Sequence, residues 1–238
     1  MRAVILAGGL GTRLRPFTTS FPKPLMPLGE HPVLEILLRR LKVHGVEEVT
    51  LLTGHLAYLI ESYFADGSGL GMAIDYVRED EPLGTAGPMR QLRGRITEDF
   101  LVMNGDLLTD VDFGALMRWH EQTGASATVS MYRREERLEL GVLKVDAAGN
   151  VTGYDEKPTL SLDISMGLYA LSPDVLERIP AGRYDMPQLI VDLLSDGRRV
   201  VGWPHSGLWF DIGRADDYAS ANEAFTRDPG AFLPDLTR

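Results

Sequence analysis

The chain has 238 residues, of which 44% are hydrophobic and 24% charged, and a net charge of −10, which is the composition of a globular protein with one large or two small domains. The absence of cysteine excludes disulfides, thiolate metal ligands and cysteine nucleophiles, and the acidic balance argues against nucleic acid as a partner, since that requires a basic face. The N-terminal apolar run of about five residues is too short for a signal peptide and no stretch is long enough to span a membrane, so we expect a cytoplasmic protein without a membrane partner.

The first half of the chain predicts alternating strands and helices. We expect strands at 1–7, 48–53, 73–77, 100–103 and 127–132, and helices at 32–44, 56–64, 85–92 and 113–122. Strands separated by helices imply a mostly parallel sheet covered on both faces, which binds ligands at the carboxyl ends of its strands.

The second half has a different pattern. It predicts a hairpin at 142–145 and 151–154, strands at 164–171 and 199–203, and helices at 173–179, 187–194 and 215–225. We therefore expect an α/β fold, a three-layer αβα Rossmann-like arrangement around a mostly parallel, mixed sheet with a smaller subregion. The chain is expected to form one domain, 1–238, with halves at 1–135 and 136–238 and the site between them.

A Gly-rich loop after the first strand is the most informative segment. It contains Gly8, Gly9 and Gly11 and carries Arg13, and Lys23 follows shortly after. Backbone amides beside glycines approach phosphate oxygens closely and form an anion-binding nest. The segment fits neither a P-loop nor the dinucleotide fingerprint, whose third glycine is a leucine here. A tight turn with exposed arginines is the structural alternative, but the whole pattern favours a polyanionic small molecule.

Two aspartates follow apolar strands next to a glycine. Asp106 ends an Asn-Gly-Asp segment after the strand at 100–103, and Asp211 lies within a Trp-Phe-Asp-Ile-Gly segment. Carboxylates in such positions suit Mg²⁺, which takes one or two carboxylates together with substrate phosphates. An isolated Asn-Gly-Asp is more often an Asx turn or a helix cap, so the residues alone leave both interpretations open.

Lys157 stands at the end of the predicted hairpin in a Glu-Lys-Pro segment. The proline cannot continue a ladder and fixes the exit of the chain, which would hold the lysine in one direction. A solvated lysine at a polar hairpin exit is the alternative.

The segment 81–88 is interpreted as a loop that leads into a helix. Gly84 or Thr85 would lie near the helix N-cap, where backbone N–H groups are free to bind a ligand. Glu81 is a candidate acceptor for a base amine. Thr53, at the end of the second strand, is a candidate for the wall of the base pocket, and His55 could equally cap the next helix.

Together these motifs resemble the signature of the sugar-1-phosphate nucleotidyltransferases, also called nucleoside-diphosphate-sugar pyrophosphorylases. The resemblance covers residues 1–225 or so, and the motifs stand in the family's order. The segment 81–88 looks most like that of the mannose-1-phosphate guanylyltransferases and related hexose- or heptose-1-phosphate enzymes. We expect the chain to lack the C-terminal left-handed β-helix that some members carry.

The resemblance implies a role for each motif. Arg13, Lys23 and Asp106 are expected to be catalytic, and Asp106 and Asp211 to share a Mg²⁺ ion. The expected nucleotide-binding residues are Leu6, Ala7, Gly8, Gly9, Gly11, Thr12, Arg13, Thr53, Glu81, Gly84 and Thr85. The expected sugar-phosphate-binding residues are Asn104, Gly141, Glu156, Lys157 and Gly167.

The implied reaction transfers a nucleotidyl group from a nucleoside triphosphate to a sugar-1-phosphate and releases pyrophosphate. GTP with mannose-1-phosphate, or with a related hexose- or heptose-1-phosphate, is the first expectation. UTP or dTTP with a glucose- or amino-sugar-1-phosphate is the alternative, and a cytidylyltransferase is a further rival. A catalytically silent nucleotide-sugar sensor is the rival of another class. Exposed apolar residues on helix 187–194 would permit a homodimer.

Overall fold

The computed structural model describes residues 1–233, within which no helix has the length and apolar character needed to cross a membrane. Its strands are β1 (Arg2–Ala7), β2 (Pro27–Leu28), β3 (His31–Pro32), β4 (Glu48–Thr53), β5 (Ala73–Arg78), β6 (Phe100–Asn104), β7 (Leu107–Thr109), β8 (Ala127–Arg137), β9 (Val142–Val145), β10 (Val151–Asp155), β11 (Thr159–Leu171), β12 (Val200–His205) and β13 (Trp209–Asp211). Its α-helices are α1 (Val33–Val43), α2 (Ala57–Phe64), α3 (Phe113–Thr123), α4 (Met186–Ser195), α5 (Ala215–Arg227) and α6 (Pro229–Phe232). Short 3-10 helices are η1 (Thr12–Leu14), η2 (Phe17–Thr19), η3 (Lys23–Leu25), η4 (Ser68–Leu70), η5 (Gly87–Leu92) and η6 (Pro173–Arg178).

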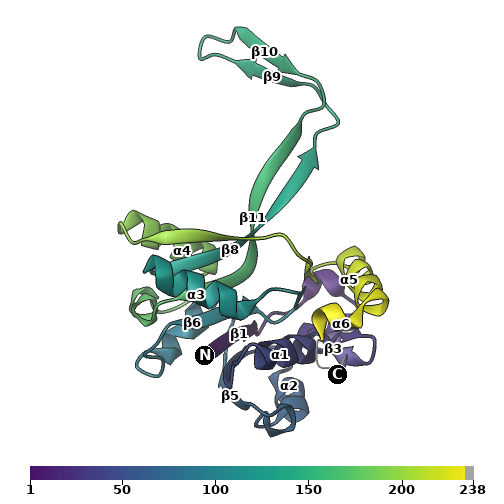
Figure 1. Ribbon diagram of the computed structural model, residues 1–238, viewed down its shortest axis with the longest axis vertical. Helices are drawn as coiled ribbons and strands as arrows, with labels where there is room; N and C mark the ends of the chain where they lie inside the picture. Colours follow the sequence, from purple (N-terminus) through teal and green to yellow (C-terminus); the bar gives the residue numbers. More distant parts are fainter. Residues whose placement is uncertain (234–238) are drawn as a thin grey trace.

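A seven-stranded sheet with the order β12-β8-β11-β6-β1-β4-β5 forms the centre of the molecule (Figure 1). The strands β6, β1, β4 and β5 are parallel to one another, and β12 is parallel to β8. Only β11 breaks the pattern, since it is antiparallel to both β6 and β8. The expected α/β fold with a mostly parallel, mixed sheet is confirmed.

Both faces of this sheet are covered. Alternate residues of β1 enter different cores: Ala3 and Ile5 pack with residues of α1, α2 and α3, whereas Val4 packs with residues of α4, η5 and η6. Successive side chains of a strand point to opposite faces, so this alternation places helices on both sides of the sheet. The result is the expected three-layer arrangement.

A third core connects the C-terminal helices with the carboxyl ends of the strands. Phe225 of α5 and Phe232 of α6 pack with Leu14 of η1, Leu108 of β7 and Ile212, which follows β13. This packing holds β7, β13 and η1 beside one another, although they come from distant parts of the sequence.

Several elements differ from the sequence-based expectation. The helices expected at 85–92 and 173–179 are the six-residue 3-10 helices η5 and η6, each with a proline in its first turn. The strands β7 and β13 were not predicted, because three residues are too few for a periodic pattern. The strands β8 and β11 are longer than expected and pair with each other over their whole added length.

This added length forms an arm, residues 133–163, that projects from the body of the molecule (Figure 1). The outer parts of β8 and β11 make a two-stranded ribbon, and β9 and β10 form a separate two-stranded hairpin at its end. The predicted hairpin is therefore present, but it lies on the arm and away from the main sheet.

Candidate active site

A pocket of about 550 Å³ opens at the carboxyl ends of β1 and β6, where ligands bind in sheets of this kind. Its size is that of a site for a nucleotide-sized molecule. Its lining residues are Leu6, Ala7, Gly8, Gly9, Leu10, Gly11, Thr12, Arg13, Lys23, Pro24, Leu52, Glu79, Pro82, Gly84, Thr85, Pro88, Asn104, Asp106, Arg183, Asp185 and Gly213.

The Gly-rich loop forms one wall of the pocket, and its glycines are required by close contacts. A Cβ atom at Gly8 would lie 2.5 Å from Oε1 of Glu79. Gly11 has φ +59°, in the left-handed region, and its carbonyl accepts a hydrogen bond of 2.7 Å from Oγ1 of Thr18. The loop ends in η1, where Leu14 is buried, so that Arg13 beside it faces the pocket.

Asp106 and Lys23 meet at the floor of the pocket. Nζ of Lys23 makes an ion pair with Oδ2 of Asp106, and both side chains are only 14% exposed. Gly105 permits this placement, because its amide donates to the Leu6 carbonyl (3.0 Å) and a Cβ there would lie 3.1 Å from Cγ2 of Ile5. The end of β6 is thus held tightly against β1, and the Asp106 carboxylate turns into the pocket.

Asp211 lies beside Asp106 through strand pairing. The antiparallel strands β13 and β7 place Asp211 opposite Leu107, and the Ile212 amide donates to the Asp106 carbonyl at 3.2 Å. Burial, and then the neighbouring Asp106 carboxylate, raises the pKa of Asp211, while the cations Lys23 and Arg13 act in the opposite direction. Two carboxylates and two cations therefore form one electrostatic group.

The donor set fits a divalent cation. Oδ1 of Asp106 is buried and has no hydrogen-bond partner among residues 1–233, although buried carboxylate oxygens are normally paired. The described residues contain no group of three or more acidic, histidine or cysteine side chains that would enclose a metal by themselves. Asp106 lines the pocket and Asp211 lies beside Asp106, outside the lining residues. Two neighbouring carboxylates of this kind suit an ion such as Mg²⁺, which completes its shell with water and substrate phosphate oxygens.

Residues 2–228 match the sequence profile described as "Nucleotidyl transferase". The chain belongs to the nucleotidyl transferase family. It is 36% identical over 233 residues to the mannose-1-phosphate guanylyltransferase of Mycobacterium tuberculosis and 35% identical over 241 residues to a UTP–glucose-1-phosphate uridylyltransferase of Synechocystis. These matches cover 94% and 93% of this chain but only 64% and 62% of the two relatives, so the chain spans less than two thirds of their length.

A solved structure has the same fold. The crystal structure of HddC from Yersinia pseudotuberculosis superposes with a TM-score of 0.75 at 26% identity, over 94% of this chain and 99% of that one. A second crystal structure of HddC is a complex with GMP-PN.

The structure places most of the expected nucleotide-binding residues in one pocket. Leu6, Ala7, the loop residues 8–13 and Gly84 line it. Thr53 and Glu81 do not: Thr53 is fully buried, while its neighbour Leu52 lines the pocket, and around Glu81 the lining residues are Glu79 and Pro82. Burial raises the pKa of Glu79, whose Oε2 accepts a hydrogen bond of 2.8 Å from the Leu83 amide.

The expectation of free backbone amides at the start of the segment 85–92 is wrong. The Thr85 amide donates to Oδ1 of Asp185 at 2.9 Å, and the amides of Ala86 and Gly87 donate to the Tyr184 carbonyl. Gly84, Thr85 and Pro88 line the pocket, but the amides of Thr85, Ala86 and Gly87 are already hydrogen-bonded to residues just before α4.

The expected sugar-phosphate-binding residues fall into two separate groups. Asn104 lines the pocket and touches Gly167, whose φ is +69° and where a Cβ atom would lie 2.5 Å from Nδ2 of Asn104. Gly141, Glu156 and Lys157 instead gather on the arm, where the hairpin joins the ribbon. The pocket has no lining residue from the arm.

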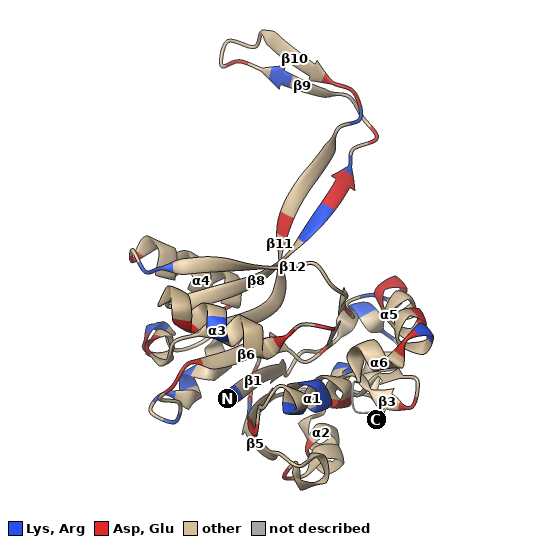
Figure 2. Ribbon diagram, in the orientation of Figure 1, with Lys and Arg blue, Asp and Glu red and all other residues tan. Residues whose placement is uncertain are grey.

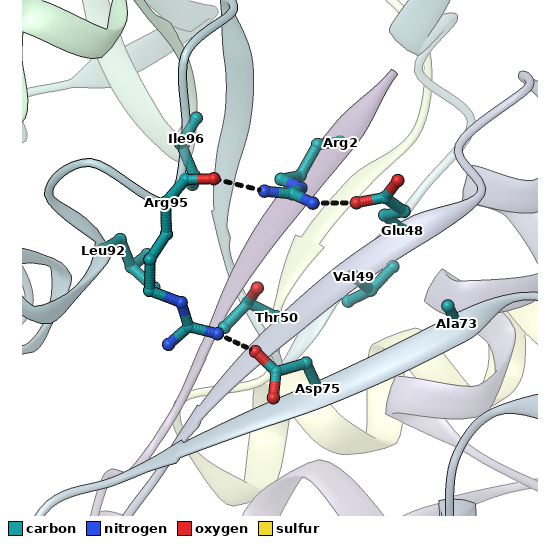
Figure 3. A pocket seen from close by; sticks show the side chains of 9 residues that line it. All are labelled: Arg2, Glu48, Val49, Thr50, Ala73, Asp75, Leu92, Arg95 and Ile96. Atoms are coloured by element: carbon teal, nitrogen blue, oxygen red, sulfur yellow. Dashed lines mark hydrogen bonds and ion pairs between the residues drawn. The ribbon is translucent and has the colours of Figure 1, made fainter.

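A smaller pocket of about 270 Å³ lies at the opposite, amino-terminal ends of β1 and β4 (Figure 3). Arg2 forms an ion pair with Glu48 and donates to the Arg95 carbonyl at 2.9 Å, and Arg95 forms an ion pair with Asp75. These side chains tie the strand ends to each other. These side chains pair with one another and lie at the end of the sheet opposite to the one that binds ligands, so we assign them a structural role.

Three charged residues of the pocket were not predicted from the sequence. Glu79, Arg183 and Asp185 all line it, and Arg183 and Asp185 lie 3.9 Å apart in an exposed ion pair. Arg183 adds a third cation to the pocket, in an acidic protein. Its only signal in the sequence is its place in a glycine-containing loop before a helix, which is a common context for an arginine.

Proposed function

We propose that this chain transfers a nucleotidyl group from a nucleoside triphosphate to a sugar-1-phosphate, giving an NDP-sugar and pyrophosphate. The observation that carries the proposal is the buried, unpartnered Oδ1 of Asp106 beside Asp211, at the end of a pocket that also contains Lys23 and Arg13. A reaction between two phosphorylated anions needs carboxylates that bind a metal ion, and basic side chains nearby that bind the phosphates. The names of the relatives in the nucleotidyl transferase family support the same reaction class.

Asp106 and Asp211 would hold Mg²⁺. When bound, this ion would neutralise charge on the reacting phosphates and help to orient them. Burial and the neighbouring Asp106 carboxylate raise the pKa of Asp211, and a cation between the two carboxylates would offset their repulsion.

The cations of the pocket act by position and charge. Arg13, on η1 beside the Gly-rich loop, would stabilise the leaving pyrophosphate through its planar guanidinium group. Lys23 would contact the phosphates of both substrates in place of part of its ion pair with Asp106. No general base is needed, because the phosphate of a sugar-1-phosphate is already ionised near neutral pH. Asn104 and Gly167 would border the sugar, and Lys157 with Glu156 would complete the acceptor site.

The best candidate pair is GTP with mannose-1-phosphate or with a related hexose- or heptose-1-phosphate. The guanylyltransferase of M. tuberculosis and the GMP-PN complex of HddC support guanine. The uridylyltransferase of Synechocystis is almost equally similar to this chain, and it supports UTP with glucose-1-phosphate as the second candidate.

Pyrophosphate release with Mg²⁺ tests the proposal. ATP, GTP, CTP, UTP and dTTP are each combined with mannose-, glucose-, glucosamine- and heptose-1-phosphates. Release that requires both substrates is expected for one base and one or a few sugars. Thermal stabilisation by a nucleotide-sugar without release for any pair would contradict transfer and indicate the sensor.

A further inference from the structure

One face of the arm, residues 133–163, here called the apolar face, carries exposed apolar side chains that nothing in the described chain covers. Along β11, apolar Leu160, Leu162 and Ile164 alternate with polar residues, which is the pattern of a strand with one buried face. Leu160 and Leu162 are nonetheless 42% and 45% exposed. Directly opposite residues share a face, so Leu160 and Leu162 stand beside Glu136 and Arg134, which form an ion pair with each other. The other face of the ribbon is polar throughout and includes a bidentate contact between Arg133 and Asp163.

The hairpin at the end of the arm is amphipathic in the same way. The register pairs Val145 with Val151 and Leu143 with Tyr154, so these four side chains share one face, and each is more than half exposed. The other face has the ion pair between Lys144 and Asp155. Figure 2 shows few charged residues on the hairpin. An isolated two-stranded hairpin is marginally stable in water, so its apolar face requires a partner surface.

The ribbon holds the neck of the arm far from the chain's own pocket. Seven consecutive residue pairs, from Thr159 opposite Arg137 to Ser165 opposite Met131, keep it extended. At roughly 3.3 Å per residue, Thr159 lies about 26 Å along β11 from Gly167, which contacts the pocket residue Asn104. This is several times the reach of a lysine side chain, so Lys157 cannot touch a ligand in the pocket of its own chain in this conformation.

The neck is nevertheless organised around Lys157. This lysine has φ +46°, a conformation that is uncommon for a residue with a side chain and that concentrates at functional sites. Its Nζ lies 3.7 Å from Oε2 of Glu139 in an exposed ion pair, which holds it weakly. Tyr154 packs against Gly141, and its hydroxyl donates to Oε2 of Glu156 at 2.9 Å. Three expected acceptor-site residues thus form one preformed group without a ligand pocket of their own.

We propose that two copies of this chain exchange arms: the apolar face of each arm is covered by the other copy, and the neck with Lys157 and Glu156 completes the substrate pocket of that copy. The part of this inference that concerns the pocket rests on the proposed function. A second copy is the occupant because an isologous pair covers both arms at once. The ribbon and hairpin together are about 40 Å long and about 10 Å wide, so one face of the arm has an area of about 400 Å². Each arm would bury this face and an equal area of the other copy, so two arms would bury on the order of 1,600 Å² in total, the size of a standard stable interface.

Continuity with the site supports the same partner. The apolar face of the ribbon extends through Ile164 and its opposite neighbour Tyr132, whose ring lies 5.5 Å from that of Trp209. Trp209 is on β13, two residues from Asp211. The uncovered face therefore leads from the tip of the arm to the wall of the acceptor side, where an arm from another copy would arrive.

Sedimentation equilibrium of two double variants tests the exchange without any substrate. Leu143→Asp with Leu162→Asp places charges on the arm's apolar face, and Val191→Asp with Leu194→Asp does the same on α4, where these residues are 53% and 55% exposed. All four positions are solvent-exposed in the single chain, so both proteins should fold. We expect a wild-type dimer, a monomeric arm variant and a dimeric α4 variant. A wild-type monomer, or a dimer disrupted only by the α4 changes, would overturn the proposal.

Complementation tests whether the site is completed by the partner. Asp106→Asn and Lys157→Ala, each inactive or strongly impaired alone, are mixed and allowed to re-associate. A mixed dimer contains one complete site, formed by the pocket of the Lys157→Ala chain and the arm of the Asp106→Asn chain. Random exchange should therefore restore about one quarter of the wild-type rate.

Failure of this test can be separated from failure of the proposed function. No recovery in a mixture whose mixed dimers are confirmed by a tag on one variant would overturn completion in trans, and would show that the arm folds onto its own pocket. If the wild type itself transfers no nucleotidyl group, the proposed function fails, while the sedimentation result still decides the exchange of arms.

Discussion

Replacing Asp106 by Asn keeps the size of the side chain and removes its charge from the floor of the pocket. This change has two opposing effects on the stability of the chain. The ion pair with Lys23 is lost, and with it the repulsion that Asp106 exerts on Asp211. Removing one partner of a fully buried pair costs about 3–5 kcal/mol, but here both side chains retain 14% exposure and Asp211 remains as a partner for Lys23. We therefore expect a loss of about 1 kcal/mol, or a fall in Tm of about 2–4 °C for a chain of this length.

The effect on turnover should be far larger. The carboxylate would be lost as a cation ligand at the position where charge develops, and this should lower kcat by about 10³-fold or more, equivalent to about 4 kcal/mol in the barrier. The assay is pyrophosphate release at saturating substrates, together with thermal unfolding of the same preparation. Asp80→Asn, an equal charge change at an exposed residue outside the pocket lining, is the matched control and should keep full activity.

Two results would refute this reasoning. More than about a tenth of wild-type turnover in Asp106→Asn would remove the residue from the cation site, since a lost ligand cannot cost so little. A loss of stability above about 4 kcal/mol would show that Asp106 mainly maintains the fold through its ion pair.

Three further predictions concern the loop, the strand end and a buried histidine. Arg13→Lys should reduce kcat about tenfold or more, because an ammonium group does not reproduce the planar guanidinium. The control Arg15→Lys, at a residue outside the pocket lining, should change kcat little. A kcat of Arg13→Lys within about threefold of wild type would exclude Arg13 from the reaction. Gly105→Ala should lower the free energy of unfolding by about 1–3 kcal/mol in urea titrations, because the new Cβ atom would lie only 3.1 Å from Ile5 of β1. Gly69→Ala, where the new Cβ atom would have no neighbour within 4 Å, should be nearly neutral. Equal effects of the two substitutions would contradict the packing argument. Burial lowers the pKa of His120 below the ordinary value of 6.5, so the unfolded chain binds a proton at this histidine before the folded chain does. The free energy of unfolding should therefore fall as pH drops below 6.5, by up to about 1.4 kcal/mol per pH unit. An equal pH dependence in His120→Gln would show that other groups cause the loss of stability.

The pairing of Asp106 with Asp211 shows how far local patterns can predict the site. Each aspartate stands out as a carboxylate beside a glycine after an apolar strand, but nothing local indicates that they meet. Their proximity depends on pairing between β13 and β7, which are about a hundred residues apart, and on the core that holds both against the C-terminal helices. Only the order of the motifs, through the family resemblance, suggested the pair.

The arm shows where local patterns were insufficient. The hairpin was predicted from its turn and its apolar residues, but the ribbon that carries it was not. The run Arg133–Arg137 contains only charged residues, so it has no strand periodicity and is extended only because it pairs with β11. The alternation of Leu160, Leu162 and Ile164 was a signal that could have extended β11 towards Thr159.

The pocket wall near Glu79 shows a third limit. Two acidic residues, Glu79 and Glu81, stand in the same loop, and only the hydrogen bond from the Leu83 amide decides which of them turns inward. The amides around Thr85 were expected to be free because helix N-termini usually leave them so. Here Asp185 and the Tyr184 carbonyl, a hundred residues later in the chain, satisfy them.

The most direct test of nucleotidyl transfer is to measure both products of one reaction. With the most productive pair of substrates and Mg²⁺, chromatography should show one NDP-sugar formed for each pyrophosphate released, in the wild type but not in Asp106→Asn. A nucleoside monophosphate with pyrophosphate, and no NDP-sugar, would mean that water is the acceptor and would contradict the assignment of the acceptor side to a sugar phosphate.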